Sequence, residues 1–505
     1  MKKSSFWRFL EIFPGALAWT GIILPIIFSF IWPSAVAIYV LLFDLYWVIN
    51  ALLMANFMFS SFRKMKAALH TDFGSKLDSL DISDPLVVDC NNIYQVVMFA
   101  TFREELDTLE PSVESVVEST WPNERKIIML AGEERDLERL KRVSSSLKAK
   151  YGGKIFDFIV SIHPDGIEGE VRGKGAGCHF AGELLSKYIA DKGIDDENVL
   201  VTIADADTRF QKQYLNALAY EFCINPNRHR RTYQPIPLFS NNIWHAHFIS
   251  RLTAWGSSFW QMIEASRPWR LVNFSTHSYS LKMLREMDYW FVNVVNEDSG
   301  QFWRAYFAFN GDHRVMPIYL PVHMDAVFAE DLKTTLKNQY LQKRRWAYGI
   351  EHFPFIVTSA IKDRKIPFMD KFVRIFRLVF DSYNWSTASF YLALVGWLPL
   401  IFSESYRSTV LSVNMPLLTK LLLPLAWIFT AISAYISLVF LPPKPENIKK
   451  SKYFEMIAQW FILPVTAVIW GSIPAMEAQS RFMLGKYLTF WVTPKSVKNE
   501  AQKTR

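Results

Sequence analysis

The apolar residues of this chain are concentrated near its two ends. Two apolar runs open the sequence, at about residues 12–32 and 35–59, and Pro33 and Ser34 separate them. Each run approaches or exceeds the roughly 20 residues that a helix needs to cross a bilayer. No small-residue cleavage site follows the first run, so it reads as an anchor rather than a signal peptide. The pattern predicts a transmembrane hairpin.

Basic residues flank this hairpin on both sides. They are Lys2, Lys3 and Arg8 before it and Arg63, Lys64 and Lys66 after it. Lys and Arg beside a membrane span mark the cytoplasmic side, so both ends of the hairpin are expected in the cytoplasm. The net charge of +8 therefore requires no nucleic-acid partner.

The middle of the chain changes to the pattern of a globular enzyme. Short β-rich runs occur at 96–99, 126–130 and 199–203, and amphipathic stretches such as 133–150 separate them. Alternating strands and helices predict an α/β domain around a largely parallel sheet.

Membrane character returns at about 378–402 and 418–441, and a basic stretch, 444–452, follows. The next apolar stretch, 454–484, is broken by Pro464 and Pro474. By length it fits one span, a re-entrant hairpin or helices lying in the interface. The basic residues on both sides of it favour the same cytoplasmic side for both ends, so we expect a re-entrant or interfacial segment.

These patterns give four parts: an N-terminal transmembrane hairpin (1–65), a cytoplasmic catalytic domain ending in interfacial helices (66–377), a transmembrane and re-entrant part (378–485), and a cytoplasmic tail (486–505). The chain is expected to be a multi-pass protein of the plasma membrane. Cys90, Cys178 and Cys223 show no metal-ligand spacing and too few partners for a disulfide framework, which agrees with reduced cytoplasmic thiols.

The strongest local signal for chemistry is Asp205-Ala206-Asp207, directly after the apolar run 199–204. Ligands of α/β sheets gather at the carboxyl ends of strands. Two carboxylates one residue apart can hold Mg²⁺ against a diphosphate, because Mg²⁺ takes few carboxylates plus phosphate oxygens. The same spacing also occurs in ordinary turns, so this motif alone does not decide between the two.

Two further clusters follow. Asn296-Glu297-Asp298 offers a carboxylate as general base, although taken alone the cluster is better explained as a helix N-cap region. In Gln342-Lys343-Arg344-Arg345-Trp346, the residues Gln342, Arg345 and Trp346 share one helix face. Such a face suits a phosphate and a sugar ring, and it also suits a basic helix at a membrane surface.

Together, Asp205-x-Asp207, Glu297-Asp298 and Gln342-x-x-Arg345-Trp346 resemble the ordered DxD, (T)ED and QxxRW motifs of processive family 2 glycosyltransferases, such as cellulose and hyaluronan synthases. Three other segments resemble the same family: Thr101-Phe102-Arg103-Glu104 is similar to TYNE, Gly173-Lys174-Gly175-Ala176 to GK-x-x-A, and Phe490 to Lys495 to the FxVTxK gating loop.

The resemblance implies an α/β GT-A fold with N- and C-terminal transmembrane helices, a UDP-activated donor, and inversion at the anomeric carbon. Asp207, with Asp205, would ligate Mg²⁺ or Mn²⁺, and Asp298 would be the catalytic base. The implied donor-binding residues are Thr101, Glu104, Glu133, Lys174, Asp205, Thr493 and Lys495. Glu297, Gln342, Arg345 and Trp346 would bind the diphosphate and the acceptor.

The sequence departs from the family pattern where the first aspartate should follow the run 126–130. Ala131-Gly132-Glu133-Glu134 stands there, so Glu133 and Glu134 are the candidates to replace the residue that binds the nucleobase, and the motif does not fix the base of the donor. Three functions remain open: a polymerase that extends and translocates a polysaccharide, a transferase that adds one sugar to a lipid or glycan, and a catalytically silent scaffold.

Overall fold

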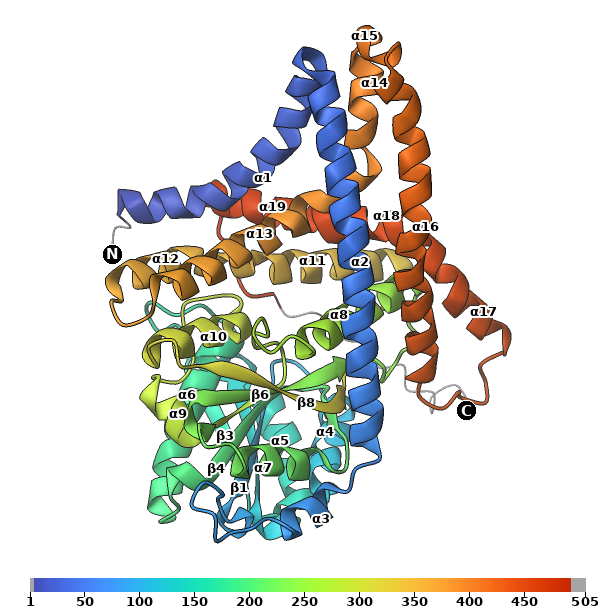
Figure 1. Ribbon diagram of the computed structural model, residues 1–505. Coiled ribbons are helices and arrows are strands. Elements are labelled where there is room, and N and C mark those ends of the chain that lie inside the picture. Colours follow the sequence, from blue (N-terminus) through green and yellow to red (C-terminus); the bar gives the residue numbers. More distant parts are fainter. Residues whose placement is uncertain (1–3, 492–505) are drawn as a thin grey trace. The chain divides into compact units, whose positions relative to one another are not determined.

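The computed structural model describes residues 4–491, apart from some side chains between 415 and 426. It divides into two compact units, seen in Figure 1. The helical unit comprises Met1–Ser60, Trp244–Phe259 and Leu332–Leu488, and the sheet unit comprises Ser61–Ile243, Trp260–Asp331 and Thr489–Arg505. The sheet unit is thus built from segments that the helical unit interrupts.

The sheet unit is built on one eight-stranded sheet in the order β3-β2-β1-β4-β7-β6-β8-β5. Its strands are β1 (Tyr94–Ala100), β2 (Lys126–Glu133), β3 (Asp157–His163), β4 (Val199–Asp205), β5 (Arg209–Phe210), β6 (Arg231–Leu238), β7 (His277–Ser280) and β8 (Arg314–His323). The first four are parallel to one another. β7 runs antiparallel to both β4 and β6, and β5 runs antiparallel to β8.

Helices cover both faces of this sheet. They are α3 (Phe73–Asp78), α4 (Leu106–Val117), α5 (Leu137–Tyr151), α6 (Lys174–Asp191), α7 (Tyr214–Cys223), α9 (Leu281–Glu286) and α10 (Glu297–Ala308). Successive side chains of a strand point to opposite faces. Accordingly, Val97 and Phe99 of β1 join a core with α4, α5 and α7, while Val96 and Met98 join a second core with α6 and α9.

The strands expected at 96–99, 126–130 and 199–203 are confirmed as the centre of the sheet. Two expectations were wrong. The sheet is mixed rather than largely parallel, because the short strand β7 enters it antiparallel. The helix expected at 133–150 begins only at Leu137, because β2 continues to Glu133, which pairs with His163 of β3.

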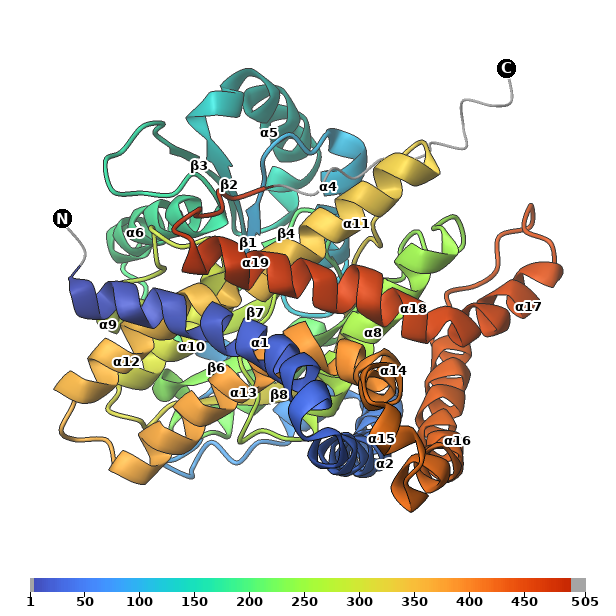
Figure 2. The same cartoon turned by 90° about the horizontal axis from the view of Figure 1, so that it is seen from above.

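The helical unit contains the apolar helices. They are α1 (Ser5–Ile31), α2 (Pro33–Leu69, whose last residues belong to the sheet unit), α11 (Leu332–Ala347), α12 (Phe353–Lys362), α13 (Phe368–Ala393), α14 (Leu398–Phe402), α15 (Glu404–Arg407), α16 (Val410–Val439), α17 (Ser451–Ala458), α18 (Leu463–Ala467) and α19 (Ile473–Met483); α8 (Phe248–Ala265) is shared between the units. Within this unit, α11 and α19 run crosswise to α2 and α16, as Figures 1 and 2 both show.

Three helical stretches of the described residues are long and apolar enough to cross a membrane: Ser5–Ile31, Pro33–Leu69 and Ser451–Met483. A fourth arises if α13 and the helices up to Phe402, which are bent by 45°, count as one span. The last stretch of the three contains the segment for which we expect a re-entrant or interfacial course. Its length and composition alone also permit a crossing, so that course stays a prediction.

Candidate active site

Several of the predicted donor residues lie at one edge of the sheet. Ala100 of β1 pairs with Ala131 of β2 and with Asp205 of β4, and Glu133 of β2 pairs with His163 of β3. These are the carboxyl ends of four parallel strands, the edge at which ligands of open α/β sheets bind. The segment that begins at Thr101 and the Asp205-x-Asp207 motif therefore leave the sheet side by side.

Lys174, in the first turn of α6, joins two of the predicted motifs. Its Nζ lies 3.0 Å from Oδ1 of Asp205 and 3.0 Å from Oδ1 of Asp298, and 3.9 Å from Oε1 of Glu297. The lysine side chain is only 8% exposed. Residues from three separate segments, at 174, 205 and 297–298, thus meet around one ammonium group.

The electrostatics of this cluster keep Lys174 charged. Burial by itself lowers the pKa of a lysine, but the carboxylates of Asp205, Asp298 and Glu297 outweigh it and raise the pKa of Lys174 well above its ordinary value. A lysine buried without partners would instead lose its proton readily. The ammonium is therefore a fixed positive charge between Asp205 and Asp298.

Ser275, which lies just before β7, completes this arrangement. Its hydroxyl donates to Oδ2 of Asp205 at 2.8 Å, and its backbone N–H donates to Oδ2 of Asp298 at 3.2 Å. Its backbone has φ of 51°, in the left-handed region that non-glycine residues rarely adopt. Strain of this kind persists only where the surrounding contacts impose it, and it clusters at functional sites.

Asp207 is held by a separate set of contacts. It is 2% exposed, and its Oδ2 accepts the backbone N–H of Asp325 at 2.8 Å. The side-chain amide of Asn241 donates to the backbone carbonyl of Asp207 at 3.0 Å and to Oδ1 of Asp325 at 2.9 Å. Asn241 and Asp325 follow β6 and β8, so strands from the second half of the sheet orient the DxD motif.

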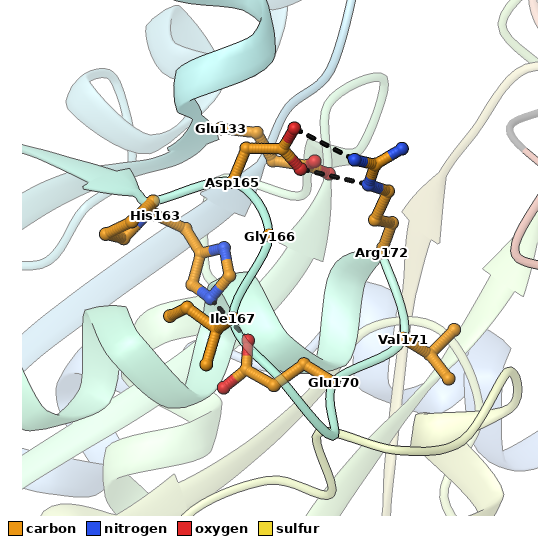
Figure 3. A pocket seen from close by; sticks show the side chains of 9 residues that line it. Glu133, His163, Asp165, Gly166, Ile167, Glu170, Val171 and Arg172 are labelled. Atoms are coloured by element: carbon orange, nitrogen blue, oxygen red, sulfur yellow. Dashed lines mark hydrogen bonds and ion pairs between the residues drawn. The ribbon is translucent and has the colours of Figure 1, made fainter.

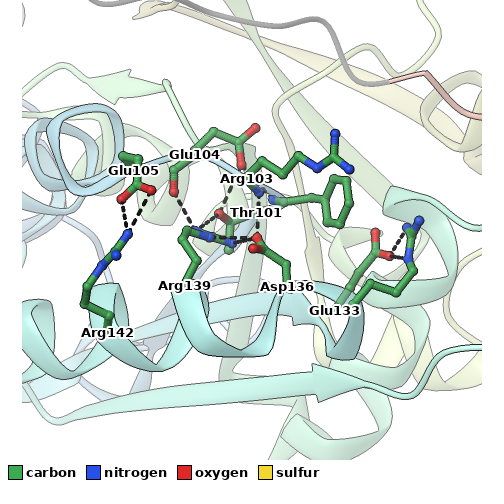
Figure 4. Close-up of polar contacts among 10 residues, drawn as sticks. Thr101, Arg103, Glu104, Glu105, Glu133, Asp136, Arg139 and Arg142 are labelled. Carbon is green, nitrogen blue, oxygen red and sulfur yellow. Dashed lines mark hydrogen bonds and ion pairs between the residues drawn. The ribbon is translucent and has the colours of Figure 1, made fainter.

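The segment after β1 folds into a tight polar loop (Figure 4). Oε2 of Glu104 accepts the Thr101 hydroxyl at 3.1 Å and the backbone N–H of Phe102 at 2.6 Å. Arg139 of α5 also donates to the Thr101 hydroxyl, at 3.1 Å, and Asp136 accepts the backbone N–H of Arg103, whose φ is 73°. The hydrogen bonds of the Glu104 and Thr101 side chains thus hold the loop in this conformation.

A small pocket of about 100 Å³ lies at the ends of β2 and β3 (Figure 3). Its lining residues are Glu133, His163, Pro164, Asp165, Gly166, Ile167, Glu170, Val171 and Arg172. His163 Nε2 lies 2.8 Å from Oε2 of Glu170, and Asp165 is paired with Arg172 at 2.9 Å. Glu133 is paired with Arg135. Glu133, one of the two candidates for the place of the family's first aspartate, therefore faces a concave, charged surface.

The start of the FxVTxK segment lies against the GK-x-x-A segment. A Cβ placed on Gly173 would come within 2.6 Å of the Phe490 ring, so only glycine permits this approach. Phe490 thereby packs directly beside the residue that precedes Lys174. Thr493 and Lys495, the other two predicted residues of the segment, lie outside the described residues.

Gln342, Arg345 and Trp346 lie on α11 of the helical unit. Oε1 of Gln342 accepts the side-chain amide of Gln339 at 3.2 Å, and the Lys343 ammonium lies 4.4 Å from the centroid of the Trp346 ring. Burial of the Lys343 ammonium lowers its pKa to about 7. The predicted face of this helix carries the guanidinium of Arg345 and the ring of Trp346.

Sequence reasoning missed Ser275, Asn241 and Asp325. Asp325 follows the apolar end of β8 much as Asp205 ends β4, so a strand-end search finds it. No sequence signal marks Ser275, because its contacts depend on a left-handed backbone conformation that serine rarely adopts.

A comparison with known families now identifies the chain. The family model described as Glycosyl transferase family group 2 matches residues 200–473, more than half of the 505 residues. The chain belongs to this family. It is therefore a glycosyltransferase, and the predicted GT-A-like α/β fold is confirmed, with a curled sheet that is mixed.

No curated protein sequence matches this glycosyltransferase. Similar solved structures include the mannosyltransferase PcManGT from Pyrobaculum calidifontis in complex with GDP-Man and Mn²⁺, at 14% identity over 80% of this chain and 97% of that chain, with a TM-score of 0.43. Another is S. aureus TarS 1-349 in complex with UDP-GlcNAc, at 14% identity over 68% and 91% of the two chains, with a TM-score of 0.33.

The chemistry of the DxD side chains suits a divalent cation. Among the residues that the structure describes, no three His, Cys, Asp or Glu side chains gather into a closed metal cage. Mg²⁺ is commonly bound by one or two carboxylates together with substrate phosphates, and does not need such a cage. Asp205 and Asp207 at a strand end fit that open kind of site.

Proposed function

We propose that this glycosyltransferase transfers a sugar from a nucleotide diphosphate sugar, by resemblance a UDP-sugar, to a growing polysaccharide with inversion at the anomeric carbon. The observation that carries the proposal is the position of Lys174, which contacts Asp205 and Asp298 at 3.0 Å each. In the family pattern, the first of these carboxylates lies beside the donor and the second is the base. One side chain therefore links the two halves of the proposed reaction.

In this proposal the donor nucleotide binds along the carboxyl edge of β1, β2 and β4. The Thr101–Glu104 loop and the pocket beside Glu133 receive the base and ribose. Asp207 and Asp205 hold Mg²⁺ or Mn²⁺, which when bound neutralises the charge that develops on the departing diphosphate. Thr493 and Lys495 are proposed to contact the nucleotide, and the described start of their segment, Phe490, packs against Gly173.

Asp298 acts as the general base. Its carboxylate removes the proton from an acceptor hydroxyl, the oxygen forms a bond to the anomeric carbon, and the bond from that carbon to the diphosphate oxygen breaks. Lys174 and the backbone N–H of Ser275 hold the two carboxylate oxygens, so the base has a defined orientation. Glu297, Gln342, Arg345 and Trp346 are proposed to bind the diphosphate and the terminal acceptor sugar.

We further propose that the catalytic unit is cytoplasmic and that the enzyme is a multi-pass membrane protein. The apolar helices α1 and α2, with basic residues on both flanks, support this topology. The crosswise course of α19 relative to α2 and α16 supports an interfacial segment before the tail, if α2 and α16 stand upright in the bilayer. QxxRW and FxVTxK favour a processive enzyme.

The test is incorporation of radiolabelled sugar by the full chain in membranes, with a panel of UDP- and GDP-sugars and with sizing of the product. Long polymer from one donor supports the proposal, whereas a single added sugar favours the transferase that modifies a lipid or glycan. No incorporation from any nucleotide sugar would leave only the silent scaffold. The Asp298→Asn variant serves as the background control.

A further inference from the structure

The DxD motif forms a tight turn that leads from β4 to the short strand β5. The Thr208 N–H donates to the carbonyl of Asp205 at 2.9 Å, which closes the turn around Asp207. β5 pairs antiparallel with β8, and the register of this pairing, continued beyond the two strands, brings Asp207 opposite Asp325. These segments all belong to the sheet unit. The position of Asp207 therefore depends on the chain that follows β8.

The segment directly after β8 is held by the loop that follows β6. The Met324 N–H donates to the carbonyl of Leu238 at 2.9 Å, and the Met324 carbonyl accepts the backbone N–H of Asn241 at 3.1 Å. The next N–H of the segment, that of Asp325, donates to Oδ2 of Asp207 at 2.8 Å. The loop after β6 therefore fixes the backbone group that holds the Asp207 carboxylate.

The Asn241 side chain also connects this loop directly to Asp207. Its amide donates to the carbonyl of Asp207 at 3.0 Å and to Oδ1 of Asp325 at 2.9 Å. A third acceptor, the carbonyl of His323, lies at 3.4 Å. An amide NH₂ carries two N–H groups, so the two shorter contacts use both of them. Asn241 thus contacts both the proposed cation ligand and the residue whose N–H orients that ligand.

We propose that Asn241 is a positioning residue of the cation site, which acts through Asp207 and sets the affinity of the site for Mg²⁺ or Mn²⁺. The inference rests on the proposed role of Asp207 as a cation ligand. Groups that hydrogen-bond a metal ligand fix its orientation, and their loss commonly costs about 10–100-fold in metal affinity. Removal of the Asn241 amide breaks both of its links, so the orientation of the Asp207 carboxylate is less well fixed. Asn241 itself contacts no cation in this role.

Asn242, the next residue of the same loop, provides a matched control. Its side chain donates to the carbonyl of Ala326 at 2.9 Å and accepts the Ala326 N–H at 2.8 Å. Asn242 therefore joins the same loop to the same segment with two hydrogen bonds of similar length, but neither of them involves Asp207. If Asn241 served only to join the loop to the segment, the two asparagines would be equivalent.

The experiment measures Mn²⁺ binding to the full chain from the electron paramagnetic resonance signal of free Mn²⁺, with UDP or GDP present, alongside thermal unfolding. Asn241→Ala should raise the Kd for Mn²⁺ by about 10–100-fold, because the orientation of the cation ligand is no longer fixed. Asn242→Ala should bind Mn²⁺ as the wild type does, although its unfolding temperature should fall by a similar amount, because both variants lose two hydrogen bonds. Asn241→Ser, whose hydroxyl is too short to reach both acceptors, should weaken Mn²⁺ binding as alanine does, and it takes the place of the alanine variant if that variant does not fold.

Wild-type Mn²⁺ affinity in the Asn241 variants would overturn the proposal. An equal loss of affinity in Asn242→Ala would also overturn it, because the joining of the loop to the segment would then explain the effect. The binding test requires no sugar transfer, so a chain that binds Mn²⁺ but transfers no sugar loses the proposed function and keeps this proposal. A wild-type chain that binds neither Mn²⁺ nor Mg²⁺ with either nucleotide rejects the cation role of Asp207 and the role of Asn241 with it, whereas the incorporation assay still decides the transfer.

Discussion

The sharpest test of the proposed chemistry is Asp298→Asn. Asp298 lies in the first turn of α10, with Oδ1 on the Lys174 ammonium at 3.0 Å and Oδ2 on the Ser275 N–H at 3.2 Å. Asparagine has nearly the same shape but only one acceptor oxygen. Its amide NH₂ must therefore face one of these two donors, which costs about 1–3 kcal/mol of folding stability.

The effect on catalysis should be larger than this structural cost. A general base typically contributes ~10²–10⁴-fold, so we expect turnover to fall by that factor, equivalent to roughly 2.7–5.5 kcal/mol of activation free energy. The assay is single-turnover transfer from the best donor, alongside equilibrium binding of that donor, with the exposed carboxylate variant Glu286→Gln as control. Turnover within about threefold of the wild type would show that another residue is the base, and an equal loss of donor binding would make Asp298 a donor ligand instead.

Three other expectations concern the same unit. Asp207→Asn should abolish turnover and weaken donor binding in Mg²⁺ or Mn²⁺, and full activity in EDTA would reject the metal role. Ser275→Ala should raise the donor KM by about tenfold, because the hydrogen bond to Asp205 is lost. Ser275→Gly should lose the same activity but unfold at a higher temperature than the alanine variant, because glycine relieves about 1–2 kcal/mol of left-handed backbone strain. Equal unfolding temperatures of the two variants would show that the backbone of Ser275 is not strained. Burial lowers the pKa of His323 to about 4. This neutral histidine therefore contributes stability that is complete above about pH 6.5 and is lost, up to roughly 3 kcal/mol, as the pH falls towards 4. His323→Gln should flatten that acid limb in pH-dependent unfolding, and an unchanged limb would contradict the assignment.

The centre of the fold was predictable because buried parallel strands read as continuous apolar runs. The outer half of the sheet was not. β6 contains Pro235 and Pro237, and β8 contains Pro317 and Pro321, residues that argue against a strand when a sequence is read alone. The two strands nonetheless pair in parallel, with a register shift after Pro235. Tertiary pairing therefore overrode the local signal at these positions.

The same contrast holds at the site. The ordered motifs predicted Asp205, Asp298 and Lys174 as neighbours of one nucleotide sugar, and the structure brings the three side chains together. The roles of Asp207 and Glu133 remain predictions. No sequence pattern revealed that Ser275 bridges Asp205 and Asp298, because the contact requires its positive φ and the antiparallel entry of β7.

The balance of charge at the cluster gives an independent reason to expect a metal-dependent donor. Lys174 brings one positive charge to a site whose motif carboxylates are Asp205, Glu297 and Asp298, with Asp207 nearby on the same strand end. If all four are ionised, the site carries three excess negative charges, and a diphosphate would be repelled from it. A divalent cation shared by the DxD carboxylates and the diphosphate offsets most of this repulsion. We therefore expect nucleotide and cation to bind together, each raising the affinity for the other by the same factor. Nucleotide binding that is equally tight with and without Mn²⁺ would mean that a cation other than the metal balances the charge instead.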